Sequence, residues 1–260
     1  MEIIRSGDTV PTMLLSLALS TFLSLATAAE VDFRFAFQNP DVRTPNLRIP
    51  SSYESAVQAR RVLALQSIAT LSTVFPHTDA SGQQSRPNDV GGAPIGLMEY
   101  YASCGPETYN PTILAISIAT SFENAKAGSN MTLSLRYHPP ADRPPSDDPY
   151  TYSPANMPRF SLIGYLERLS PEEIQRNEVH SCFLKEHPHA RPWTPGNIIH
   201  ESWWAKLVVE EIYWIGGFGD RAYIGWIPLE QWQRVTSKEV ANARLVGEHG
   251  WVPGAEYGEL

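Results

Sequence analysis

The chain alternates between short runs of aliphatic, aromatic and β-branched residues and polar connections that contain Gly and Pro. These runs predict seven strands, at residues 67–75, 93–104, 111–119, 130–138, 159–169, 202–215 and 221–227. In the fourth run Met131, Leu133 and Leu135 alternate with polar residues, a pattern typical of a half-buried strand. Strands outnumber helices and sequence neighbours look antiparallel, so the pattern predicts a mainly β fold, a closed or partly closed barrel with a few covering helices.

Helical spacing and capping residues predict the covering helices. They are expected at residues 51–67, 120–129, 170–187 and 228–235. The helix at 170–187 has the clearest start, because Ser170 is a good N-cap and Pro171 suits the first helical position.

The remaining segments set the expected domain limits. We predict a signal peptide at 1–28, an N-terminal extension with the start of the first helix at 29–60, the barrel at 61–235 and a polar C-terminal tail at 236–260. Residues 138–158 are dense in Pro, Asp and Ser, which indicates a surface excursion rather than a core element.

The N-terminus has the pattern of a secretory leader. The run from Met13 to Ala29 is apolar and ends in small residues, and Ala26-Thr27-Ala28 resembles a cleavage site. The alternative is an uncleaved membrane anchor, but the run is short for a span and diluted by Ser and Thr. We therefore expect a protein that is secreted or resident in the secretory or endolysosomal pathway, with no membrane span after cleavage.

A chain that passes through an oxidising secretory compartment can form disulfides and receive N-linked glycans, which bears on its two cysteines and its one sequon. Cys104 and Cys182 are expected to form a disulfide, the alternative being two buried free thiols. Asn130-Met131-Thr132 is a glycosylation sequon, so Asn130 is the expected attachment site.

Residues Gly217 to Ala222 fit the loose dinucleotide-binding pattern G-x-G-x-x-A. That fingerprint needs a helix to open within it, so that the helix N-terminus faces the phosphates. Here strand-forming residues follow and Pro228 comes soon after, so the pattern predicts a strand, a Gly-rich turn and a strand.

The formal net charge of −8 and the lack of a basic run argue against nucleic acid as a partner.

Several stretches stand in an order that resembles a known family. They are VLALQSIATLSTV, GAPIGLMEYY, LAISIATSFENAKAGSNMTLSLRY, RFSLIGYLERL, CFLKEHPHARPW and WWAKLVVEEIYWIGGFGDRAYIGWI. Together they resemble the pyridoxamine 5′-phosphate oxidase-like superfamily of FMN-binding split barrels, and within it the secreted CREG-like branch. The resemblance implies a six-stranded antiparallel split barrel that forms a homodimer. In the superfamily's enzymes FMN lies between the subunits, whereas flavin binding is lost in the secreted branch.

The resemblance also says where an FMN phosphate would be held. The family's enzymes place cations on the second strand and at the start of the short helix, but here the second strand carries Glu99, and Phe122 and Glu123 stand at the helix positions. A phosphate beside either carboxylate would be repelled.

Four residues remain as candidates for cofactor binding by resemblance. Ser117, Thr120 and Ser121 match hydroxyl positions of the family, and Lys126 lies within about a turn of the missing cations. The alternative, which we favour for the three hydroxyls, is that they serve at a strand end and as helix caps.

No catalytic residue is predicted, and a metal site is weighed only for His187, His189, His200 and Glu201. The two closer histidines are separated by a proline, a spacing that suits metal binding poorly, so we predict no metal ligands.

Two functions remain. The first is a secreted glycoprotein without catalysis that recognises an unknown protein or small molecule as a dimer. The alternative is an FMN- or haem-binding oxidoreductase of the same superfamily.

Overall fold

The computed structural model describes residues 48–77, 86–87, 89–140, 153–219 and 222–251. The predicted signal peptide, the middle of the Pro-rich excursion (141–152) and the end of the tail (252–260) lie outside these residues. What the sequence predicts for those segments remains a prediction.

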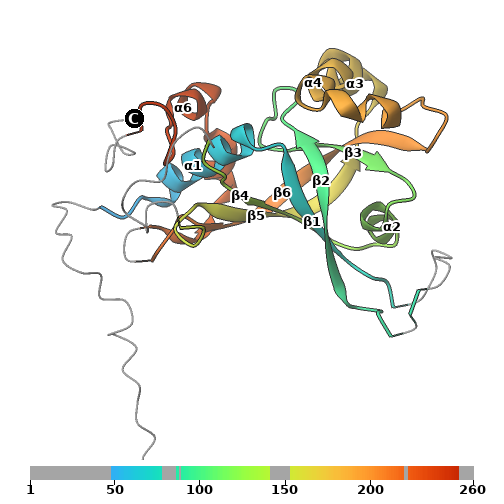
Figure 1. Cartoon of the computed structure of the whole chain (residues 1–260), viewed down its shortest axis with the longest axis horizontal. Coiled ribbons are helices and arrows are strands. Elements are labelled where there is room, and N and C mark those ends of the chain that lie inside the picture. The colour runs from blue at the N-terminus through green and yellow to red at the C-terminus, as the bar shows by residue number, and fades with distance from the viewer. Residues whose placement is uncertain (1–47, 78–85, 88, 141–152, 220–221, 252–260) are drawn as a thin grey trace, which may run out of the picture. The chain divides into compact units, whose positions relative to one another are not determined.

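Six strands form a closed antiparallel barrel (Figure 1). The strands are β1 (Ile68–Val74), β2 (Pro94–Ala102), β3 (Thr112–Ile116), β4 (Met131–Arg136), β5 (Arg159–Arg168) and β6 (Ser202–Ile215). They follow the order β3-β2-β1-β4-β5-β6, and β3 also pairs with β6, which closes the ring. A seventh strand, β7 (Ile224–Ile227), pairs with the last residues of β6 and stays outside the ring. The predicted six-stranded antiparallel barrel is confirmed, and the last of the seven predicted strands lies outside it.

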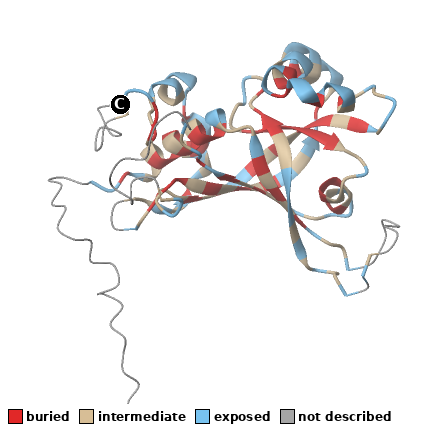
Figure 2. Cartoon of the chain, in the orientation of Figure 1, coloured by how far each residue is buried: buried red, intermediate tan, exposed pale blue. Residues whose placement is uncertain are grey.

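Buried residues alternate with more exposed ones along the strands (Figure 2), and the side chains of the buried ones fill the barrel. Leu71, Leu133, Leu162 and Ile212 stand opposite one another on four neighbouring strands, and all four are fully buried. Directly opposed residues point to the same face of a sheet, so these four form one layer of the core. The predicted alternation in β4 is confirmed.

The helix α1 (Ser52–Leu65) packs on this core. It begins at Ser52 because Ser51 and Glu54 form a reciprocal capping box. Its buried side includes Arg60, whose guanidinium donates to the Trp232 carbonyl oxygen at 2.9 Å and stacks over the Trp232 ring. The first predicted helix is thus confirmed.

The segment at 170–187 is two helices, so the prediction of one helix is wrong. Ser170 caps α3 (Pro171–Arg176) as expected, and α4 (Val179–Glu186) follows. Between them Glu178 has a φ of 47°, in the left-handed region that an α-helix cannot contain. A 3₁₀ turn, η2 (Pro188–Trp193), continues the chain.

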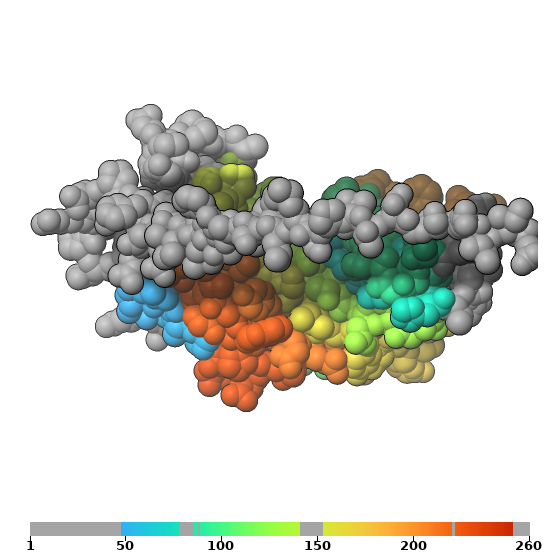
Figure 3. Space-filling view, turned by 90° about the horizontal axis from the view of Figure 1, so that it is seen from below, coloured from blue at the N-terminus to red at the C-terminus, as the bar shows by residue number. Residues whose placement is uncertain are grey.

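The C-terminal segment is not the featureless tail that the sequence suggests. After α5 (Leu229–Arg234), a capping box between Thr236 and Glu239 starts α6 (Ser237–Asn242). Leu245 then enters the core cluster, and buried Glu248 pairs with Arg61 of α1. In Figure 3, α1 (blue) lies beside the later part of the chain (orange). Residues 236–251 therefore belong to the fold.

The Gly-rich segment joins β6 and β7 as predicted. The N–H of Gly216 donates to the carbonyl oxygen of Tyr223 at 3.0 Å, and Gly217 has a φ of 149°, a conformation that favours glycine. The next helix is α5, which begins only after Pro228. The segment is a hairpin turn and lacks the helix that a dinucleotide site requires.

Candidate functional site

The short helix α2 (Thr120–Lys126) carries most of the candidate cofactor residues. It lies against β1 and β2, where the amide of buried Asn124 donates to the hydroxyl of Thr73 at 3.1 Å. Its N-cap is Ala119, and no side chain caps its first turn. The favoured alternative that a hydroxyl caps this helix is therefore wrong.

The structure does not bring the four candidates to one place. Ser117 and Lys126 line a groove of about 570 Å³, whereas Ser121 is fully buried and lies beside Glu99 of β2. Thr120 is half-buried at the start of α2 and does not line that groove. The candidate hydroxyls and Lys126 thus do not converge on a single anion.

The groove lined by Ser117 and Lys126 is called here the α2 groove. It lies between α2, the end of β5 and the beginning of β6. Its apolar walls come from Phe122, Ala125, Leu166 and Trp203, and its polar residues are Ser117, Lys126, Ser129, Asn130, Tyr165, Arg168 and Glu201. The guanidinium of Arg168 lies over the Trp203 ring, 5.3 Å from its centre. The groove thus combines apolar walls with a rim rich in polar side chains.

The electrostatics of the β2–α2 contact oppose a phosphate. Burial raises the pKa of the Glu99 carboxyl to about 7, and the neighbouring Ser121 side chain opposes this rise. The Ser121 hydroxyl nevertheless has no well-formed hydrogen bond with any described residue. A carboxyl group that is partly charged at neutral pH therefore lies beside Ser121, one of the candidate phosphate ligands.

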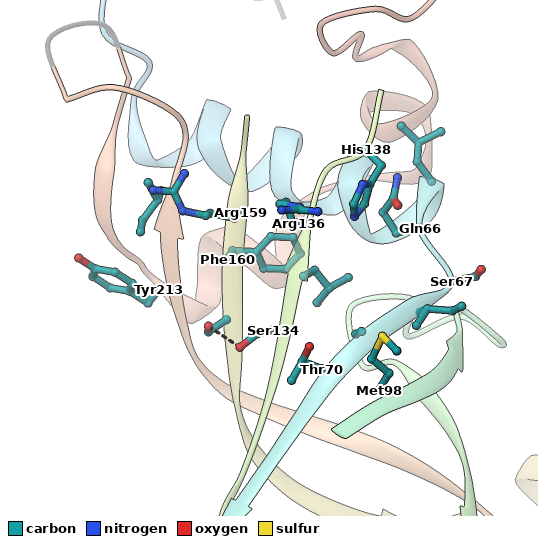
Figure 4. A pocket seen from close by; sticks show the side chains of 16 residues that line it. Gln66, Ser67, Thr70, Met98, Ser134, Arg136, His138, Arg159, Phe160 and Tyr213 are labelled. Atoms are coloured by element: carbon teal, nitrogen blue, oxygen red, sulfur yellow. Dashed lines mark hydrogen bonds between the residues drawn. The ribbon is translucent and has the colours of Figure 1, made fainter. Parts of the chain in front are cut away.

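A second groove, of about 740 Å³, was not anticipated (Figure 4). It is called here the α1–β4 groove, because its lining runs from Leu65 to Thr70 and across the outer face of β4, β5 and β6. Arg136 and Arg159 stand directly opposite each other on β4 and β5, and His138 lies near Arg136. Its described lining contains no carboxylate. Arginine at the outward positions of two predicted strands was the signal that sequence reasoning passed over.

A family model described as "CREG, beta-barrel" matches residues 50–234. The chain belongs to the CREG β-barrel family. No curated protein matches this CREG chain.

Solved structures similar to this CREG protein are distant from it in sequence. A heme binding protein from Mycobacterium smegmatis is 18% identical with a TM-score of 0.50, and the match covers 72% of this chain and 61% of that chain. A FAD-binding protein from Mesorhizobium loti is 16% identical (TM-score 0.38; 60% and 91% covered). A pyridoxinephosphate oxidase family protein from Clostridium acetobutylicum is 10% identical (TM-score 0.39; 63% and 89% covered). The chain spans less than two thirds of the heme binding protein, and these identities concern the fold alone.

The two cysteines of the CREG chain are joined. The Cys104–Cys182 disulfide ties the segment after β2 to α4, as predicted. It borders a second core cluster in which Phe183 of α4 packs on Trp204 of β6.

The histidines near this cluster serve packing. Buried His187 donates from Nε2 to the Tyr101 carbonyl oxygen at 2.8 Å, and its ring lies 6.0 Å from that of His189. Within the described ranges, no three His, Cys, Asp or Glu side chains are grouped as a metal site requires.

The helices of the described residues are too short or too polar to cross a membrane.

Proposed function

We propose that this CREG protein is a secreted glycoprotein that acts through surface recognition and has no catalytic activity of its own. The observation that carries the proposal is the separation of the candidate phosphate ligands. Ser121 is buried beside Glu99, while Ser117 and Lys126 line the α2 groove. A flavin phosphate needs cations and donors that converge on it, and this arrangement does not supply them.

Secretion and glycosylation are parts of the same proposal. The predicted leader would carry the chain into a compartment in which the Cys104–Cys182 disulfide forms and persists. Asn130 is exposed and precedes β4, so an oligosaccharyltransferase would have access to its amide.

The outer face of the sheet is the proposed recognition surface and the proposed dimer contact. Directly opposed residues on β2, β1, β4, β5, β6 and β7 form one outward row: Met98, Thr70, Ser134, Ser161, Tyr213 and Trp226. Met98 is 78% exposed and Trp226 is 54% exposed. An aromatic and a methionine at the two ends of a polar row are typical of interface residues rather than of an ordinary solvent-exposed face.

The visible absorbance spectrum of the secreted protein tests the proposal. The spectrum is recorded after purification, and again after incubation with FMN followed by dialysis. We expect no flavin band in either sample. A flavin band that survives dialysis would contradict the proposal and make redox assays the next step.

A second candidate, binding of an anionic cofactor such as flavin or haem, is favoured by the α1–β4 groove. Arg136 and Arg159 would pair with phosphate or propionate groups, and His138 offers the only imidazole of its lining. A haem-type band in the purified protein that is lost in Arg136→Ser and His138→Ala variants would support this candidate over the first.

A further inference from the structure

We propose that the glycan on Asn130 docks back into the α2 groove and covers Ser117 and Lys126. This inference rests on the secretion and glycosylation proposed above. It assigns to the groove a ligand of defined chemistry, the protein's own N-linked saccharide, and it explains how a site-like groove would stay closed to other molecules.

The position of Asn130 is the first argument. Asn130 lines the α2 groove itself and is exposed there. The next residue, Met131, pairs with Gly164 of β5, so Asn130 stands at the level of Tyr165 on the neighbouring strand. Tyr165 also lines the groove and is 45% exposed. A sugar attached to Asn130 would therefore leave the backbone beside an accessible aromatic ring.

The chemistry of the walls is the second argument. Phe122, Leu166 and Trp203 give the groove apolar walls, and Trp203 is only half-buried. A pyranose ring presents C–H groups on its faces and hydroxyls around its edge. Its face would pack on an aromatic ring, while Ser117, Lys126 and Glu201 would meet the hydroxyls. A neutral saccharide needs no net charge from the site, and this rim mixes cations with a carboxylate.

The covalent link to Asn130 favours the glycan over other possible ligands of the α2 groove. A saccharide linked at the rim is present at an effective concentration on the order of millimolar, so a weak contact is enough to keep it docked. A free saccharide or a partner's side chain would have to compete with it. The groove volume of about 570 Å³ falls in the range of roughly 300–1,000 Å³ that suits small ligands.

The rate at which an endoglycosidase removes the glycan from the folded protein tests the inference. The full chain is expressed in a eukaryotic secretory host, and intact mass measures occupancy at Asn130. We expect the native wild-type glycan to be cleaved at least about tenfold more slowly than the same glycan on unfolded protein, a factor that corresponds to ~1.4 kcal/mol.

Two variants serve as matched controls. Tyr165→Ser with Arg168→Ser alters exposed groove residues and keeps the sequon, so its native glycan should be cleaved at close to the unfolded rate. Asn130→Gln with Arg244→Thr moves the sequon to exposed Asn242 at the end of α6, which does not line the α2 groove, and cleavage should again be fast.

The outcomes separate this inference from the function it rests on. An unmodified Asn130 would overturn both the docking and the proposed glycosylation. A glycan that is present but cleaved equally fast in wild type and both controls would overturn the docking alone and leave the proposed glycoprotein standing. Slow cleavage only in wild type would support the docking.

Discussion

The carboxyl group of Glu99 is partly buried, and this burial makes the stability of the barrel depend on pH. Its pKa is raised by burial to about 7 in the folded protein, whereas an unfolded chain gives the group its ordinary value near 4.5. Between these values the folded state binds more protons than the unfolded state, so stability falls as pH rises from about 5 to about 8. The loss should be on the order of 2 kcal/mol, allowing for partial exposure.

The Glu99→Gln variant isolates this effect. Glutamine is close in shape and cannot ionise, so the variant should be more stable than wild type at pH 8 and closely similar to it at pH 5. The measurement is the urea midpoint of each protein at the two pH values. Parallel curves for the two proteins would rule out Glu99 as the origin of the dependence.

At the scale of single residues, the sequence identified the types of candidate residues but not where their side chains point. It named Glu99 as an obstacle to phosphate and Ser117, Thr120, Ser121 and Lys126 as candidate ligands. Whether four side chains converge depends on how α2 sits on the barrel. That position is set by long-range contacts such as the bond from Asn124 to Thr73, which a linear pattern does not contain.

Among the elements, the bulge in β6 at Glu210 depends on one glycine of β5. The register between β5 and β6 shifts between Ile163 and Gly164, and a Cβ added to Gly164 would lie 1.9 Å from the carbonyl oxygen of Val208. Gly164→Ala should therefore destabilise the fold by at least ~3 kcal/mol. Gly219→Ala is the control, because its Cβ would meet Ile224 at an ordinary 3.5 Å. Equal thermal midpoints for the two variants would contradict this account.

The Cys104–Cys182 disulfide is a second feature that stabilises the arrangement of the elements. It closes a loop of 78 residues between the segment after β2 and α4. In the chain-entropy model a loop of that size stabilises a fold by ~4 kcal/mol, mainly through the unfolded chain. The double variant Cys104→Ser and Cys182→Ser should lower the urea midpoint accordingly without changing the visible spectrum. An unchanged midpoint would show that the bond is not structural.

The elements were predictable where the signal is local. Alternation placed the strands, and the capping boxes at Ser51 and Ser170 placed two helix starts. The equivalent box at Thr236 was overlooked because the residues after it are polar. Its helix is held by contacts far away in sequence, among them the hydrogen bond from Tyr53 to Glu239 at 2.7 Å. The break at Glu178 has no strong sequence signal, because Glu is neither Gly nor Pro.

At the scale of the whole molecule, the outer face of the described strands carries exposed apolar side chains, among them Met98 and Trp226. Besides the row that ends in Met98 and Trp226, the neighbouring row brings Ile215 and Ile224 beside Arg136 and Arg159. Like charges directly opposite each other destabilise a sheet, and the proposed partner surface would offset the repulsion between these two arginines.

A second copy of the chain is the proposed partner, and two substitutions on this face test it. Met98→Glu and Trp226→Glu change exposed side chains, so the fold should be retained. A stable dimer needs ~1,200–2,000 Å² of buried surface, and charges placed within it would be desolvated without partners. Light scattering after size exclusion should give a dimer for wild type and a monomer for the double variant. Glu178→Gln is the control, because that residue lies between α3 and α4, away from the outer row. A wild-type monomer would overturn the dimer, and a double variant that still dimerises would move the contact to another face.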